Sequence, residues 1–186
     1  MKKPVKIALI CLVIAIMITS FVLMNFTELG VVKLNKLNGN RGMFDTKFGF
    51  SADEAYATMY LMRDVGIRQH LIIHLIDYVF IMSYFIVMTL AALPFLKEKY
   101  QLFAVLVPMG LVFADLIENI TMDVAFIKFP VRDNALVSTS NVFGWIKWAM
   151  LLVWIGFFIT IVTLWFLEKR KAKQSIETIA NPEEQK

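Results

Sequence analysis

The sequence contains a single cysteine, Cys11, among 186 residues, and only 18% of its residues are charged. One cysteine excludes an intramolecular disulfide framework and a cysteine-based metal cluster. A soluble domain usually carries about 25% charged residues, whereas 59% of this sequence is hydrophobic. A glycine-rich phosphate loop, a nucleophile elbow and an internal repeat are also lacking. These shortages exclude a water-soluble globular enzyme, a disordered protein and a fibrous protein.

The sequence has instead four uninterrupted apolar blocks, at residues 7–26, 71–96, 102–127 and 142–167. Each block supplies the roughly 20 apolar residues that a helix needs to cross a bilayer. Backbone amides inside a membrane must be hydrogen-bonded within their own segment, so the blocks predict helices. The first block is too long for a signal peptide and lacks a cleavage pattern, which indicates an uncleaved anchor. We expect one all-α membrane domain over residues 1–186, with four transmembrane helices in an antiparallel bundle.

Basic residues gather beside three of these blocks, whereas segment 27–70 has nearly as many acidic residues as basic ones. The positive-inside rule therefore predicts a multi-pass protein of the cytoplasmic (cell) membrane, with both termini and the tail 168–186 in the cytoplasm. The net charge of +4 follows from this pattern, so the expected partner is the lipid bilayer and not a nucleic acid. The basic residues are Lys2, Lys3, Lys6, Lys97, Lys99, Lys169, Arg170, Lys171 and Lys173.

The predicted outer segment, residues 27–70, divides into a loop and a helix. Residues 35–42 are rich in asparagine and glycine and predict a loop. Ser51 and Glu54 have capping-box spacing, and Gly66 is expected to end the helix that they begin. We expect an amphipathic helix at the outer membrane interface. This helix is expected to be a stabilising cover over the bundle or, alternatively, a gate that controls the access of a substrate. Its periodic residues are Ala55, Tyr56, Met59, Tyr60 and Met62.

Ionisable side chains occur in three of the four predicted helices, although such residues are costly in a membrane and normally face the bundle interior. Helical spacing places one group on a single face of the second helix and another on a face of the third. At 1.5 Å per residue, the polar groups of all three helices reach depths of about 8–12 Å. We therefore expect them to meet in the outer half of the membrane. These residues are His70, His74, Asp77, Tyr84, Asp115, Glu118, Asn119 and Lys147.

Several of these residues have a purely structural alternative. Lys147 can snorkel to the outer headgroups along its aliphatic stem. Asn119 and Tyr84 can be interhelical hydrogen-bond partners, and His70 is expected at the membrane interface. Helix packing alone does not explain the three carboxylates Asp77, Asp115 and Glu118, because burying them in a membrane is costly. The candidate ligand-binding residues are Asp77, Tyr84, Asp115, Glu118, Asn119 and Lys147.

The predicted cluster holds three carboxylates and one fixed cation, Lys147, which we expect to pair with Asp115 or Glu118. A buried negative surplus has to be relieved by a proton, a bound cation or a cationic ligand. Nitrogen and oxygen donors of this kind can bind a divalent metal. Paired carboxylates beside a lysine can equally share a proton in general acid–base catalysis. The candidate metal ligands are His74, Asp77, Asp115 and Glu118.

Several short motifs between residues 49 and 154 resemble an uncharacterised family of bacterial four-span integral membrane proteins. The most specific is the Asp-Leu-x-Glu-Asn stretch that begins at Asp115. The family pattern places a proline soon after Phe80, where this sequence has Ile81. The resemblance implies the four-helix topology and the relevance of the polar residues, but no reaction. The motifs are Gly49-Phe50-Ser51, Gly66-Ile67-Arg68, Asp77-Tyr78-Val79-Phe80 with Tyr84, Asp115-Leu116-Ile117-Glu118-Asn119, and Lys147.

These observations predict an integral membrane protein that binds a small polar or lipid-headgroup ligand, or assists assembly, through its buried Asp/Glu/Lys cluster. A membrane-embedded enzyme acting on a lipid-like substrate is one alternative. An oligomeric transporter or ion-conducting protein is another, and it requires a homo-oligomer because four spans without an inverted repeat do not suffice for a pathway.

Overall fold

The computed structural model of the chain describes residues 3–180, and its regular elements over that range are all helices. Lys2 and residues 181–186 of the predicted tail lie outside the described residues. The long helices are α1 (Lys3–Phe26), α3 (Ala52–Ala92), α4 (Gln101–Lys128) and α5 (Asn134–Ala180). The short ones are α2 (Val31–Asn38) and the 3-10 turns η1 (Leu93–Phe95) and η2 (Glu98–Tyr100).

Within the described residues, four helical segments are long and apolar enough to cross a membrane: Pro4–Asn38, Ala52–Phe95, Glu98–Lys128 and Asn134–Gln174. The four predicted helices are therefore confirmed, and the chain is built as a multi-pass membrane protein. Large apolar side chains on α1 and α5 remain exposed, for example Ile7 and Leu152. Exposed apolar surface of this extent is what lipid, rather than water, would cover.

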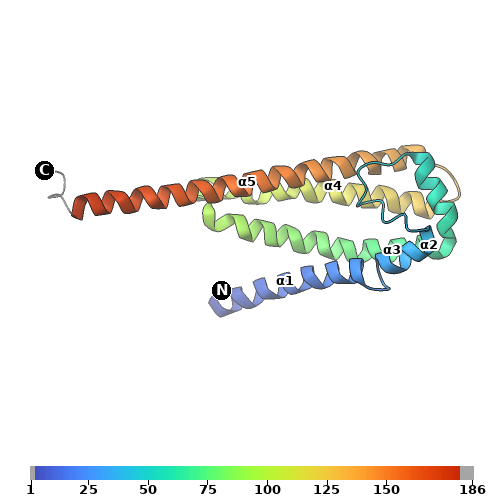
Figure 1. Ribbon diagram of the computed structural model, residues 1–186, viewed down its shortest axis with the longest axis horizontal. Coiled ribbons are helices and arrows are strands. Elements are labelled where there is room, and N and C mark those ends of the chain that lie inside the picture. The colour runs from blue at the N-terminus through green and yellow to red at the C-terminus, as the bar shows by residue number, and fades with distance from the viewer. Residues whose placement is uncertain (1–2, 181–186) are drawn as a thin grey trace.

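The long helices lie lengthwise beside one another, with α5 extending past the others (Figure 1). Helix α4 packs mainly on α5, α3 packs on α4, and α1 packs on α3. Helix α1 begins and α5 ends at the same end of the molecule (Figure 1). The opposite end is covered by a cap, which we define as α2, the loop of residues 39–51 and the first segment of α3, residues 52–62.

Helix α3 bends sharply at Arg63, where the backbone leaves the helical region (φ 51°, ψ −168°). The sequence predicted that this helix would end at Gly66, and that is wrong. The bend comes three residues earlier, and the chain then continues as helix to Ala92. Gly66 instead accommodates the bend, because a Cβ atom there would lie 2.4 Å from the Cβ of Met62.

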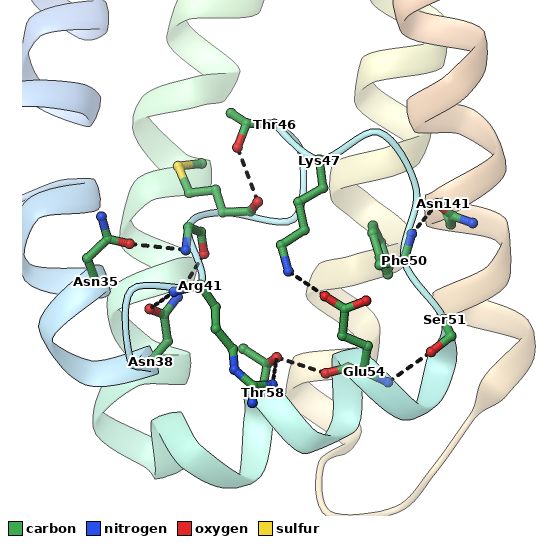
Figure 2. A network of polar contacts seen from close by, with 12 residues as sticks. Asn35, Asn38, Arg41, Thr46, Lys47, Phe50, Ser51, Glu54, Thr58 and Asn141 are labelled. Carbon is green, nitrogen blue, oxygen red and sulfur yellow. Dashed lines mark hydrogen bonds and ion pairs between the residues drawn. The ribbon is translucent and has the colours of Figure 1, made fainter.

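The start of α3 is capped as the sequence predicted in one respect only. The Ser51 hydroxyl accepts a hydrogen bond from the Glu54 backbone N–H at 3.1 Å. The Glu54 carboxylate does not complete the reciprocal capping box, because it pairs with Lys47 at 2.8 Å. That ion pair ties the loop of residues 39–51 to α3 (Figure 2).

Side chains at the end of α2 shape the cap loop that follows (Figure 2). The sequence predicted a loop for residues 35–42, but α2 extends to Asn38 and ends at Gly39 in the left-handed conformation (φ 68°). Asn38 Nδ2 donates to the Gly42 carbonyl at 2.7 Å, and Asn35 Oδ1 accepts from the Gly42 N–H at 3.1 Å. The asparagines thus stabilise the loop from the helix that precedes it.

The largest buried apolar cluster lies beneath the cap and joins it to the ends of α3, α4 and α5. Tyr56 and Met59 from the first segment of α3 are buried there, together with Leu34 of α2 and Phe44 of the loop. Phe126 of α4 packs against Phe44, with ring centroids 6.0 Å apart. The cap is therefore packed firmly onto the bundle, and the polar cluster lies directly below it.

Candidate functional site

Polar side chains from α3, α4 and α5 meet just below the cap, as the sequence predicted from their similar depth. Four side-chain pairs link α3 to α4: His74 and Tyr78 with Asp123, Asp77 with Asn119, and Tyr84 with Asp115. From His74 to Tyr84 along α3, the partner residue on α4 moves back from Asp123 to Asp115. The spacings of three, four and seven residues put these side chains on facing surfaces of the two helices.

Lys147 connects α5 to this set. Its Nζ lies 2.6 Å from Glu118 Oε2 and 3.2 Å from Asp115 Oδ1. The same ammonium donates a hydrogen bond to the backbone carbonyl of Asp45 at 3.1 Å. The predicted pairing with Asp115 or Glu118 is confirmed, and it involves both. The snorkelling alternative is wrong, because this ammonium is buried and is held by the two carboxylates of the cluster.

The remaining hydrogen bonds leave Asp77 without a cation. Tyr84 donates its hydroxyl to Asp115 Oδ2 at 2.9 Å, and Asn119 Nδ2 donates to Asp77 Oδ2 at 2.5 Å. Within the described part of the chain, no lysine, arginine or histidine nitrogen lies within 4.0 Å of the Asp77 carboxylate. Since Asp77 is only 5% exposed, an ionised carboxylate at this position would be poorly solvated and without a compensating cation.

Gly144 allows α5 to approach the carboxylate that Lys147 binds. It precedes Lys147 by three residues and so lies on the same face of α5. A Cβ atom at Gly144 would lie 2.8 Å from Glu118 Oε1. The absence of a side chain at this position therefore makes room for the Glu118–Lys147 contact.

The four predicted metal ligands do not form a metal site. Among the described residues, no group of three or more His, Cys, Asp or Glu side chains is arranged to hold a metal ion. His74 instead pairs with α4, where its Nδ1 lies 2.5 Å from Asp123 Oδ1, and Tyr78 donates to Asp123 Oδ2 at 2.7 Å. Asp123 and Tyr78 are functional candidates that the sequence analysis did not select as site residues, although Asp123 is an ionisable residue of the third predicted helix. Their spacing, four residues from Asn119 and from His74, is the signal that could have found them.

His70 is wholly buried and does not lie at an exposed interface as expected. The bend at Arg63 turns the chain so that His70 lies under the cap. Its ring packs on Phe126 and on His74, with centroids 4.7 Å apart in both cases. Neither ring nitrogen has a hydrogen-bond partner among residues 3–180. His70 and His74 thus form a layer between the cap and the carboxylates.

The polar cluster forms one end of a half-open pocket of about 330 Å³. Asp45, Asp77, Tyr84, Asp115 and Lys147 line that end. The rest of the wall is mostly apolar and comes from α1, α3, α4, α5 and the loop of residues 39–51. Asp45 belongs to a loop without periodicity, so no spacing pattern in the sequence selects it. The other lining residues are Phe21, Met24, Asn25, Met43, Thr46, Phe80, Met88, Leu111, Trp148 and Leu151.

Helix α1 forms one wall of the pocket without closing it. Phe21 and Met24 of α1 line the pocket together with Trp148 and Leu151 of α5. Across the described residues, however, α1 packs on α3 and α2 and makes no extensive contact with α4 or α5. The pocket therefore lies where α1 stands apart from α5.

The site consists of a buried ion cluster, an unpaired carboxylate and an adjoining apolar pocket. Chemically, this arrangement can hold a polar group beside an apolar chain, and Asp77 can exchange a proton. Comparison with protein families, with curated proteins and with solved structures found no match for this chain.

Proposed function

We propose that this chain is an integral membrane protein that binds an amphipathic, lipid-like ligand. The polar end of the ligand would contact the Asp/Glu/Lys cluster, and its apolar part would occupy the pocket beside α1. The observation that carries this proposal is the division of one pocket into a polar end and an apolar wall. Ligand sites typically combine apolar walls with a few convergent polar groups in this way.

The gap between α1 and α5 supports access from within the membrane. Lipids reach a protein sideways, so a pocket for an amphiphile needs an opening toward the hydrocarbon region. Helix α1 has an almost entirely apolar surface and packs on one long neighbour, α3. Movement of α1 away from Trp148 and Leu151 would widen the pocket without disrupting the α3–α4–α5 contacts.

We further propose that the helices form an antiparallel bundle with both termini in the cytoplasm and the cap outside. Later residues of α3 pair with earlier residues of α4, which supports opposite directions for these two helices. Segment 52–62 would be the amphipathic helix at the outer surface. Its buried side holds Tyr56 and Met59, whereas Tyr60 and Leu61 are exposed. In this arrangement the pocket opens to the outer leaflet.

Equilibrium binding of three labelled probes with the same tail would test the proposed function. Dodecylamine, dodecanol and dodecanoate are added to the protein in nanodiscs, and uptake is corrected for empty nanodiscs. We expect at least one probe to bind with a one-to-one stoichiometry. Leu151→Trp should abolish this binding, because Leu151 lines the pocket.

Leu152→Trp provides the matched control. Leu152 is adjacent in sequence but 70% exposed on the outer face of α5, so the same change there should leave binding intact. Failure of all three probes, or equal behaviour of the two tryptophan variants, would contradict an amphiphile site in this pocket.

A membrane-embedded enzyme acting on a lipid-like substrate is the second candidate. The uncompensated Asp77 carboxylate favours it, because general acid–base catalysis needs a positioned group that can take up and release a proton. Mass spectrometry of lipid extracts after incubation with the protein would reveal a product. The product should be missing with Asp77→Asn, whereas unchanged lipid with the wild-type protein would exclude this activity for the lipids tested.

A further inference from the structure

We propose that the ligand enters the pocket with a positively charged nitrogen, as an amphipathic amine. This inference rests on the proposed function and adds the chemical class of the polar group. Four observations carry it: the charge count, the state of Asp77, the position of Asp45 and the aromatic rings along the wall.

The polar end of the pocket has more carboxylates than its lysine can balance. Asp45, Asp77 and Asp115 line it, and Lys147 is the cation among its lining residues. That ammonium is already shared between Asp115 and Glu118. A phosphate or carboxylate headgroup would add negative charge here, and like charges in a poorly solvated site oppose each other strongly. A cation would reduce the surplus.

Asp77 is the carboxylate best placed to receive this cation. It lines the pocket, is 5% exposed, and among residues 3–180 the side-chain hydrogen bond that it receives comes from Asn119. A neutral amide donor does not cancel the charge. A bare ionised carboxylate is costly to bury, and pairing with a cation removes most of that cost. An ammonium group beside Asp77 would complete the site.

Asp45 reaches the same space from the cap. One of its carboxylate oxygens, Oδ1, is buried without a hydrogen-bond partner among the described residues. Its backbone carbonyl is fixed by Lys147. The loop that follows Asp45 is fixed as well, since Lys47 pairs with Glu54 and the Phe50 N–H donates to Asn141 Oδ1 (Figure 2). The second carboxylate is therefore positioned before any ligand arrives.

Aromatic side chains in the pocket wall also favour a positively charged ligand. Phe80, Tyr84 and Trp148 line the pocket next to the carboxylates. The Phe80 and Tyr84 rings meet edge to face with centroids 5.5 Å apart. Ring faces carry negative partial charge and attract ammonium groups. The polar end thus combines anionic and aromatic surfaces, a combination suited to an amine that carries an apolar tail.

The head group of the probe tests the inference directly. Dodecylamine, dodecanol and dodecanoate share one chain length and differ in charge. We expect wild-type protein in nanodiscs to bind dodecylamine at least about tenfold more tightly than dodecanol, a difference of about 1.4 kcal/mol. Dodecanoate should bind least. Asp77→Asn should lower the preference for the amine over the alcohol by about tenfold.

Two further variants separate charge from folding. Asp77→Glu keeps the charge and should retain the preference for the amine. Asp64→Asn removes an exposed carboxylate on the same helix and should leave it unchanged. Equal binding of amine and alcohol, or tighter binding of dodecanoate, would overturn this inference and leave the amphiphile proposal intact. Failure of all three probes would overturn both.

Discussion

At the scale of single residues, Lys147 holds the polar cluster together electrostatically. Its ammonium contacts a carboxylate of α4 at 2.6 Å and a loop carbonyl at 3.1 Å, so one side chain joins α5, α4 and the cap. Burying an ammonium costs several kcal/mol, and only close, well-placed partners offset that cost. The two acidic partners and Lys147 therefore depend on one another.

Removal of Lys147 should destabilise the protein more than removal of the whole pair. Lys147→Met leaves Glu118 and Asp115 buried without their cation, which should cost about 3–5 kcal/mol. Adding Glu118→Gln should recover part of that loss. Chemical unfolding in detergent micelles measures both variants. If the double variant is no more stable than the single one, with Asp115→Asn tested likewise, the ion pair does not carry the stability assigned to it.

Asp133 at the start of α5 should make stability depend on pH. Lys128 donates to its carboxylate at 2.9 Å and the Leu136 N–H donates at 3.3 Å, and these bonds hold the pKa of Asp133 below its ordinary value of 3.8. A group with a lowered folded pKa stabilises the fold above its unfolded pKa. That contribution is lost as the pH falls through the folded pKa.

Hydrogen exchange in the first turn of α5 measures this effect. Asp133→Asn should speed exchange relative to the wild-type protein at neutral pH, because it removes the ion pair with Lys128. The ratio of the two rates should approach one in acid below pH 3.8. A ratio that stays constant across this range would show that the ionised carboxylate does not stabilise the helix start.

At the scale of helices, α4 and α5 depend on one close approach. Gly144 and Gly156 both lie in α5, but a Cβ atom at Gly144 would press on Glu118, whereas one at Gly156 would meet nothing within 4 Å. Gly144→Ala should therefore cost about 1–3 kcal/mol through overpacking. Gly156→Ala should stabilise the helix by up to about 1 kcal/mol.

Thermal melting of the two alanine variants checks this difference. Gly144→Ala should also weaken dodecylamine binding, because it displaces the carboxylate that Lys147 holds. Equal melting temperatures for the two variants would mean that α5 does not approach Glu118 as closely as described.

The helices and the polar cluster were predictable because both depend on local spacing. Asp77, Asp115 and Lys147 each lie on a helix face that the period of the sequence determines, and similar depth implied that the faces meet. The bend at Arg63 was not predictable from spacing, because tertiary packing of the cap imposes it and Gly66 gave a misleading stop signal. Asp45 and the apolar pocket were missed for a related reason. A residue in a loop belongs to no periodic pattern that would mark it. A pocket forms where neighbouring helices leave space between them, and the spacing of residues along the sequence does not predict that space.

At the scale of the whole molecule, topology sets the direction from which a ligand arrives. With Cys11 replaced by alanine, single cysteines at Lys33 and Asn134 should react with an impermeant reagent added outside intact cells. A cysteine at Glu98 should react only after the cells are opened. All three positions are exposed. Labelling of the Glu98 position from outside would reverse the proposed orientation and place the pocket in the inner leaflet.

The central claim is that the gap beside α1 is a binding pocket for an amphiphile, and a structure in a lipid nanodisc tests it most directly. The sample should contain the dodecyl probe that binds most tightly. We predict elongated density between α1 and α5, with its polar end within about 3 Å of the Asp77 carboxylate. Helix α1 packed against α5, with no cavity and with Lys147 and its carboxylates closed off, would contradict the account.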